Sequence, residues 1–235
     1  MRQLPLAMRL RQRALFDNFV VGSNAAAVAQ LRAAATDSAA RICWIYGPAG
    51  AGKTHLLQAS CTQTLEADRQ AAYLPLDELL DYGPESLQGW QDAELVALDA
   101  MATVIGRRAW EEALFALYRG IEERHATLIA AAQTLPTQLP FVLPDLASRF
   151  AAALLLPLQP LDEHDQRQAL RSRAHARGLE LPEDSARYLQ RHFRRDLPTL
   201  CRLLDTIDTA ALQAQRRLTV PFIREVLQLK SPPAD

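Results

Sequence analysis

The stretch RICWIYGPAGAGKTHLL, residues 41–57, decides the fold of this 235-residue chain. Ile42 to Tyr46 form a short apolar run rich in β-forming residues, which predicts a buried parallel strand. The eight residues that follow, Gly47 to Thr54, match the phosphate-loop pattern G-x-x-x-x-G-K-[ST], and a helical run begins directly after them. A strand, a glycine-rich loop and a helix in this order predict a nucleotide-binding α/β domain.

Each residue type in the loop has a task in phosphate binding. Glycines let the backbone turn tightly and bring its N–H groups to the phosphate oxygens. The helix N-terminus adds its dipole, Lys53 neutralises charge on the β- and γ-phosphates, and the Thr54 hydroxyl is available to Mg²⁺. We therefore predict nucleotide binding by the whole loop, which consists of Gly47, Pro48, Ala49, Gly50, Ala51, Gly52, Lys53 and Thr54.

A second apolar strand, Leu95–Asp99, ends in a carboxylate. In phosphate-loop proteins a strand-end aspartate holds the water shell of Mg²⁺, so Thr54 and Asp99 form the predicted metal site, with ADP or ATP as cofactor. Many ATPases place a second acid next, where it orients the attacking water. Ala100 stands there in this chain, and the site should therefore bind nucleotide better than it hydrolyses it.

The residues before the phosphate loop include FDNFVVGSN, residues 16–24, followed by an expected helix over Ala25–Ala34. Ser23 or Asn24 is a candidate cap for that helix. The apolar turn of Phe19, Val20 and Val21 either covers a nucleotide base or packs in the core, and the residues alone leave both interpretations open.

The remaining pattern completes a parallel α/β domain, with strands expected over 71–76, 128–132 and 152–158 and helices over 53–64 and 109–124. Prolines near residue 160 mark a boundary, beyond which the pattern is purely helical, with caps expected at Asp162, Asp196 and Thr219. We divide the chain into a leader, 1–13, an α/β domain, 14–159, a small all-α lid, 160–230, and a tail, 231–235.

Charged residues at helical spacing favour solvent-exposed helix faces. This interpretation applies to the acids Glu111, Glu112, Glu122 and Glu123 and to the lid arginines of 167–177 and 191–195. For the lid arginines, DNA contact is the alternative.

Composition limits the classes of partner. The net charge of −1 gives no overall attraction to nucleic acid or anionic membrane. The three cysteines are far apart, and the five histidines show no metal spacing. Arginines interrupt the N-terminus and no run reaches the roughly 20 apolar residues of a membrane span, so we expect neither a signal peptide nor an anchor, and a cytoplasmic location.

The leader begins MRQLPLAMRL. Its residues Gln3, Leu4, Leu6 and Met8 form a polar-then-apolar peptide ahead of the first domain signal. Such a peptide is either disordered filler or an extended ligand that docks in a partner's pocket.

Taken together, a phosphate-loop α/β domain and a small helical lid resemble the AAA+ class. FDNFVVGSNAAAV is similar to the nucleotide-recognition stretch of bacterial DnaA-type initiators, and LPDLASRF to their arginine-finger segment, which places the finger on Arg149. The helical pattern ends near Lys230, where initiators continue into a DNA-binding domain that we expect this chain to lack, and QLPLAM resembles a sliding-clamp-binding peptide. With the segments GLELPED and RRLTVPFIREVLQL, the chain is identified over nearly its whole length as a member of the Hda family, the DnaA regulatory inactivators.

The resemblance implies two protein partners. The leader residues Gln3, Leu4, Leu6 and Met8 would dock on the DNA polymerase III sliding clamp (β subunit), so that DNA is met only through the loaded clamp. Arg149 would then enter the ATP site of DnaA and stimulate hydrolysis there, which prevents re-initiation of replication. A homodimer is left open.

The chain also departs from the initiators. They carry an acid at the tip of the fourth strand, where Gln133 stands here, and an arginine early in the third lid helix, where Pro198 stands. With Ala100, three positions linked to hydrolysis differ, and we expect weak or no ATPase activity of the chain itself. The rival functions are a self-sufficient AAA+ ATPase such as a helicase loader, and a DNA-binding initiator paralogue.

Overall fold

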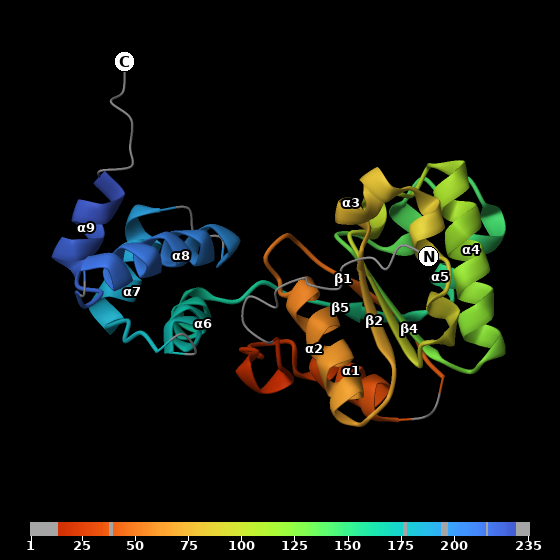
Figure 1. The fold of residues 1–235 in the computed structure, drawn as a ribbon, viewed down its shortest axis with the longest axis horizontal. Helices are drawn as coiled ribbons and strands as arrows, with labels where there is room; N and C mark the ends of the chain where they lie inside the picture. The colour runs from red at the N-terminus through yellow and green to blue at the C-terminus, as the bar shows by residue number, and fades with distance from the viewer. Residues whose placement is uncertain (1–13, 38–39, 176–177, 194–196, 215, 229–235) are drawn as a thin grey trace, which may run out of the picture. The chain divides into compact units, whose positions relative to one another are not determined.

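A computed structural model of the chain describes residues 14–37, 40–175, 178–193, 197–214 and 216–228 (Figure 1). The chain divides into two compact units between Pro160 and Leu161, and each unit is described by itself. The predicted clamp-binding peptide with Gln3, Leu4, Leu6 and Met8 lies outside the described residues.

The first unit is built on a five-stranded sheet with the order β2-β3-β4-β1-β5. Its strands are β1 (Ile42–Tyr46), β2 (Ala71–Pro75), β3 (Leu95–Asp99), β4 (Thr127–Ala132) and β5 (Leu154–Pro157). All neighbouring strands are parallel, and β1 pairs with β4 from Ile42↔Leu128 to Tyr46↔Ala132. Because the strands are parallel, their carboxyl ends lie at one edge of the sheet, and the phosphate loop begins there, after β1.

Helices cover both faces of this sheet (Figure 1). Helices α1 (Ala25–Thr36) and α2 (Lys53–Glu66) lie on one face, and α4 (Arg108–Glu123) and α5 (Pro144–Ala151) lie on the other. Trp44 and Phe150, the two largest fully buried side chains, pack with their ring centroids 5.2 Å apart on the α4–α5 side. Burial of apolar side chains on both faces is the main contribution to the stability of the unit.

The connection over 77–91, which shows little pattern in the sequence, consists of short elements. Helix α3 (Leu76–Leu79) follows β2 directly, and three single turns of 3₁₀-helix come before β3. Two of the three cysteines, Cys43 and Cys61, are buried. Burial raises the pKa of the Cys43 thiol to about 11 and that of Cys61 to about 12, so both behave as core residues.

The second unit consists of four helices, α6 (Glu163–His175), α7 (Glu183–His192), α8 (Leu197–Ala214) and α9 (Val220–Gln228). It has an apolar cluster of its own, which includes Leu170, Leu189, Leu204 and Ile223. Asp162 caps α6 as predicted, because its Oδ1 accepts a hydrogen bond of 2.8 Å from the backbone N–H of Asp165. The cap predicted at Asp196 falls outside the described residues.

Two predictions about local structure are wrong. The strand predicted to be buried over 152–158 is the shorter β5 at the sheet edge, where Leu154 and Leu155 are 42% and 39% exposed. Asn24 does not cap α1 with its side chain. Its amide instead donates to the Gln159 carbonyl (3.0 Å) and accepts from the Gln159 N–H (2.8 Å), which fastens the start of α1 to the chain after β5.

No helix in the described part of the chain is both long and apolar enough to span a membrane.

Candidate functional site

The phosphate loop lies between β1 and α2, and two of its glycines adopt left-handed backbone conformations. Gly50 has φ +81° and Gly52 has φ +94°, backbone angles that residues other than glycine rarely adopt. Lys53 folds back across the loop and donates hydrogen bonds from Nζ to the carbonyls of Gly47 (2.7 Å) and Pro48 (2.8 Å). Since α2 begins at Lys53, its first backbone N–H groups have no helical partner and are open to an anion.

Lys53 is partly desolvated in this position. Burial lowers the pKa of its ammonium group, and the nearby Asp99 carboxylate opposes that shift. A cation that water solvates poorly gains more from an arriving phosphate than an exposed lysine would.

Thr54 and Asp99 come together as the sequence predicts for a metal site. The Thr54 hydroxyl donates a 2.6 Å hydrogen bond to Asp99 Oδ2, although α2 and β3 are far apart along the chain. The other carboxylate oxygen, Oδ1, accepts from the backbone N–H of Ala100 (2.8 Å). A hydroxyl and a carboxylate side by side are the hard oxygen ligands that Mg²⁺ prefers, so this donor set fits the ion.

Tyr73 belongs to the same cluster, and sequence reasoning missed it. Its hydroxyl donates to Asp99 Oδ2 over 2.9 Å. Burial and the carboxylate both raise the pKa of Tyr73, which keeps the phenol protonated and able to donate. The contact follows from the pairing of β2 with β3, in which Tyr73 lies opposite Ala97 and Pro75 opposite Asp99. Only the sheet order reveals that pairing.

The segment around Phe19 packs against the phosphate loop. A Cβ atom placed on Gly52 would lie 2.6 Å from the Phe19 ring, and the ring lies 5.4 Å from that of His55. The Nε2 atom of His55 is 2.9 Å from the Leu15 carbonyl, which fastens the segment to the start of α2. Phe19, Val20 and Val21 are half-buried, and Phe19 and Val21 also pack against the core.

The three positions that differ from initiators are placed as follows. Ala100 comes directly after Asp99 with φ +56° and has no polar side chain. Gln133 follows β4 and is exposed. Pro198 lies in the first turn of α8.

Arg149, the predicted finger, lies on α5 and is held by its own domain. Its Nη1 pairs with Glu122 Oε2 on α4 at 2.5 Å, and its guanidinium lies 5.3 Å from the ring centroid of Tyr118 and 5.6 Å from that of Phe115. The hydrogen bond to Glu122 raises the pKa of Arg149 further. A third of the side chain remains exposed, so the group is ordered by neighbours and still reachable from outside.

Glu111 overturns the prediction that the acids of α4 form a solvated face. It is fully buried, and its carboxylate accepts backbone hydrogen bonds from Gly106 (2.7 Å), Val142 (2.9 Å) and Leu143 (2.7 Å). Leu143 is the residue before α5, so Glu111 fixes the backbone that leads to Arg149. A charge pattern at helical spacing gives no signal that separates this glutamate from its exposed neighbour Glu112.

Comparison with known families decides the identity. The model of the bacterial DnaA ATPase domain matches residues 10–156, and the model of the Hda lid domain matches residues 162–227. The chain belongs to the DnaA-like Hda family. The two matches follow each other in the order that the sequence predicts.

Solved structures confirm the predicted AAA+ core and lid of this Hda-family chain. Domain III of the Thermotoga maritima initiator DnaA superposes with a TM-score of 0.77 at 22% identity, covering 94% of this chain and 98% of that one. The AMPPCP-bound DnaA from Aquifex aeolicus gives 0.69 at 23% identity, with 85% and 66% covered. The Thermotoga maritima RuvB Holliday junction branch migration motor gives 0.62 at 15%, with 87% and 67% covered. At these identities the likeness establishes the fold.

Proposed function

We propose that this Hda-family protein binds ADP or ATP with Mg²⁺ and inactivates the initiator DnaA by stimulating hydrolysis of the ATP that DnaA holds. The observation that carries the proposal is the DnaA-type ATPase domain followed by an Hda-type lid in one chain. The geometry of the phosphate loop and the exposed edge of Arg149 support it.

Nucleotide binding rests on the loop and on the acid at the end of β3. Phosphate oxygens would replace the Gly47 and Pro48 carbonyls as acceptors of the hydrogen bonds from the Lys53 ammonium group. They would also accept hydrogen bonds from the first backbone N–H groups of α2. Thr54 and Asp99 would hold Mg²⁺, which supplies charge neutralisation between the phosphates. A solved relative is bound to AMPPCP, in agreement with this role for the loop.

The bound nucleotide would stabilise the conformation of the protein and its contact with the partner, and it would be hydrolysed slowly or not at all. Ala100 offers no carboxylate to polarise an attacking water, and the Asp99 carboxylate before it would hold Mg²⁺. We therefore propose weak or no ATPase activity in the isolated chain.

Arg149 would act in the partner's site. An arginine placed beside a transferring γ-phosphoryl group stabilises the charge that develops in the transition state. Glu111 positions the start of α5, and the aromatic rings of Tyr118 and Phe115 keep the guanidinium at the domain surface. Insertion into DnaA exchanges the Glu122 carboxylate for phosphate oxygens.

The experiment measures hydrolysis of DnaA-bound ATP with and without this protein and clamp-loaded DNA. We expect Arg149→Ala to fold and bind nucleotide normally and to lose stimulation by a factor on the order of 10³. Arg149→Lys should restore little, because an ammonium lacks the planar fork. Arg119→Ala is the matched control, since Arg119 also lies near α4 carboxylates and pairs with Glu123 at 3.0 Å. Full stimulation by Arg149→Ala would exclude the finger.

The same assay tests the leader. Replacing Gln3, Leu4 and Leu6 with alanine should remove both clamp binding and the dependence on clamp-loaded DNA while leaving ADP binding unchanged. Clamp retention by this triple variant in a pull-down would contradict the docking role. Steady ATP turnover by the isolated chain, or tight salt-dependent binding to duplex DNA without clamp, would overturn the proposed function itself.

A further inference from the structure

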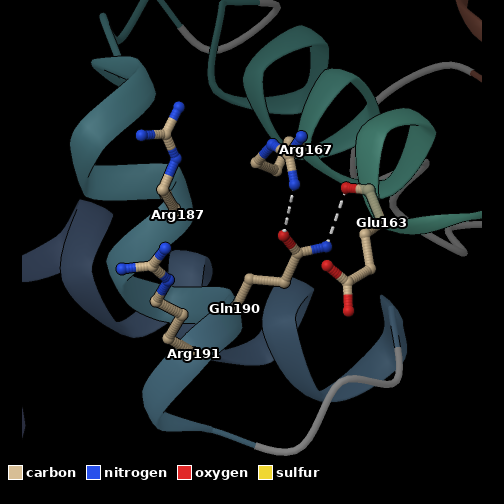
Figure 2. Close-up of a pocket in the computed structure, with 5 residues that line it drawn as sticks. All are labelled: Glu163, Arg167, Arg187, Gln190 and Arg191. Carbon is tan, nitrogen blue, oxygen red and sulfur yellow. Dashed lines mark hydrogen bonds between the residues drawn. The ribbon is translucent and has the colours of Figure 1, made fainter.

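A polar hollow of about 160 Å³ lies within the lid, between α6 and α7 (Figure 2). Glu163 and Arg167 line it from α6, and Arg187, Gln190 and Arg191 line it from α7. Neither the nucleotide site nor the proposed finger uses these residues.

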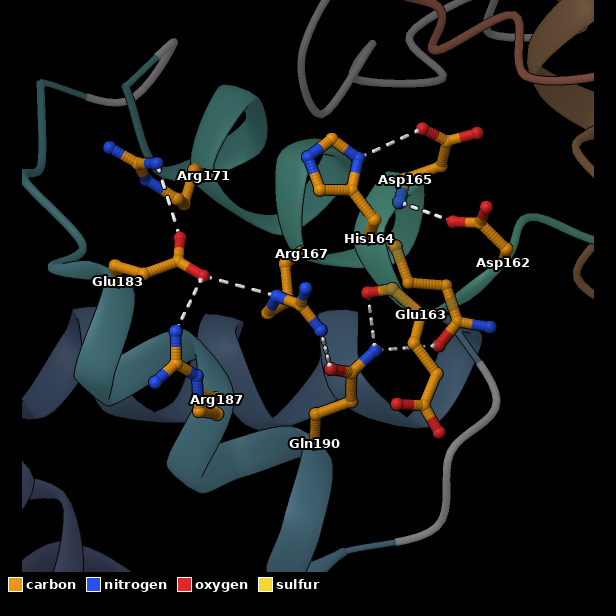
Figure 3. A network of polar contacts seen from close by, with 10 residues as sticks. Asp162, Glu163, His164, Asp165, Arg167, Arg171, Glu183, Arg187 and Gln190 are labelled. Carbon is orange, nitrogen blue, oxygen red and sulfur yellow. Dashed lines mark hydrogen bonds and ion pairs between the residues drawn. The ribbon is translucent and has the colours of Figure 1, made fainter.

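Positive charge around the hollow exceeds negative charge. The Glu183 carboxylate alone serves three guanidinium groups, those of Arg167 (3.1 Å), Arg171 (3.3 Å) and Arg187 (3.6 Å), as Figure 3 shows. Arg191 forms no hydrogen bond or ion pair with any residue of the described lid. Among the residues that line the hollow, three arginines stand against one carboxylate, that of Glu163, which is an excess of two positive charges.

The arginine from α6 is fixed before any ligand arrives. Arg167 is only 20% exposed, and it donates to Glu183 from Nε and to Gln190 Oε1 from Nη1 (2.9 Å). Gln190 is 4% exposed and is itself held, because its amide donates to the Glu163 carbonyl (2.8 Å) and to Gln166 Oε1 (3.2 Å). A guanidinium oriented in this way loses little further entropy when it binds an anion.

The two arginines from α7 face the same hollow and repel each other electrostatically. Arg187 and Arg191 are four residues apart and therefore lie on one side of the helix, where like charges repel (Figure 2). A dianion between them and Arg167 would replace that repulsion with attraction.

We propose that this hollow binds a phosphate group, contacted by Arg167, Arg187 and Arg191. A phosphate monoester carries a charge of about −1.5 to −2 at neutral pH, close to the two positive charges in excess. Its tetrahedral oxygens can accept hydrogen bonds from guanidinium groups of both helices at once. Free phosphate and a nucleic acid both offer anionic phosphate oxygens, although each backbone phosphodiester carries a single negative charge.

The experiment is a titration of the full chain with inorganic phosphate, followed residue by residue in ¹H–¹⁵N correlation spectra. The spectra separate lid binding from phosphate binding at residues 47–54. We expect saturable shifts at residues 163–167 and 187–191. Arg191→Gln should raise the phosphate concentration at half-saturation of the lid about tenfold. Arg224→Gln, which changes an exposed lid arginine outside the hollow, should leave it unchanged.

A second arm identifies the source of the phosphate. Lid shifts caused by a single-stranded oligonucleotide at lower concentration than inorganic phosphate would assign the site to a nucleic acid backbone; shifts with inorganic phosphate alone would assign it to free phosphate. The proposal is overturned if lid signals do not saturate, if chloride at equal ionic strength reproduces them, or if Arg191→Gln saturates like the wild type. Arg191 has no described partner to lose, so this variant should keep the native spectrum.

Discussion

Lys53 is the residue on which nucleotide affinity should depend most. It already gives its three-donor ammonium to two loop carbonyls, and phosphate oxygens would be stronger acceptors than those neutral groups. Lys53→Ala should weaken ADP binding about tenfold or more, or roughly 1.4 kcal/mol. Because bound ligand stabilises the folded state, ADP at a concentration near the wild-type dissociation constant should raise the melting temperature of the wild type and leave that of the variant nearly unchanged.

The control for this measurement is Arg108→Ala, which removes a cation that is 75% exposed on α4 and should keep the full response to ADP. A wild-type melting temperature that ADP does not change would mean that the loop binds no nucleotide.

The pair of Arg149 and Glu122 makes a second prediction at this scale. If Arg149 acts in DnaA, it must first leave the carboxylate that holds it at 2.5 Å. Glu122→Gln removes that competition while Tyr118 and Phe115 still support the guanidinium. Half-maximal stimulation of DnaA-bound ATP hydrolysis should then occur at a concentration a few-fold lower, the modest gain expected from loosening an exposed ion pair.

Glu123→Gln is the matched control, because it breaks the similar pair with Arg119 and should change nothing. A loss of stimulation in Glu122→Gln as deep as that of Arg149→Ala would show instead that the pair itself is the active arrangement.

At the scale of elements, α4 and α5 are joined by the buried carboxylate of Glu111. Three backbone N–H groups donate to it, from Gly106, Val142 and Leu143, and hydrogen bonds to a charged acceptor are the stronger kind. Glu111→Gln replaces one acceptor oxygen with a donor that faces other donors. We expect urea denaturation to show a loss of at least about 2 kcal/mol in the free energy of unfolding.

Glu112→Gln is the comparison for that experiment, since the side chain of Glu112 is 55% exposed and pairs with Arg108. It should change the free energy of unfolding little. Equal effects of the two substitutions would contradict the positioning role of Glu111.

The elements also show what local sequence determines. The bounds of β1 and β3 follow from apolar runs, and the phosphate loop from a fixed spacing, because both depend on neighbours along the chain. The contact of Tyr73 with Asp99, the burial of Glu111 and the edge position of β5 depend on which strands and helices become neighbours in space. That order is a property of the whole sheet, so residue patterns did not reveal these features.

The charge pattern of the lid has the same limit. Arginines at helical spacing read as a solvated face, and several are exposed. Whether an arginine side chain is fixed in place depends on a residue of the neighbouring helix. Arg167 on α6, for example, donates a hydrogen bond to Gln190 on α7. Sequence gives the charges, while the packing of α6 on α7 decides that one carboxylate serves three of them.

At the scale of the whole molecule, the buried apolar side chains of the lid cluster among themselves, as do those of the α/β unit. Leu204 on α8 is fully buried in the lid cluster. Leu204→Ala should therefore cost about 2–5 kcal/mol in the lid alone. In hydrogen exchange, amides of α6–α9 should lose protection by a factor of roughly 30 or more, while those of β1 and β4 keep theirs.

Leu114→Ala provides the reciprocal measurement, because Leu114 on α4 is 1% exposed in the core of the α/β unit. It should lower protection in the sheet and leave the lid amides unchanged. Separate responses are expected because a cavity destabilises the cooperative unit whose side chains surround it. Simultaneous loss of protection in both units from either substitution would show that the chain unfolds as one unit.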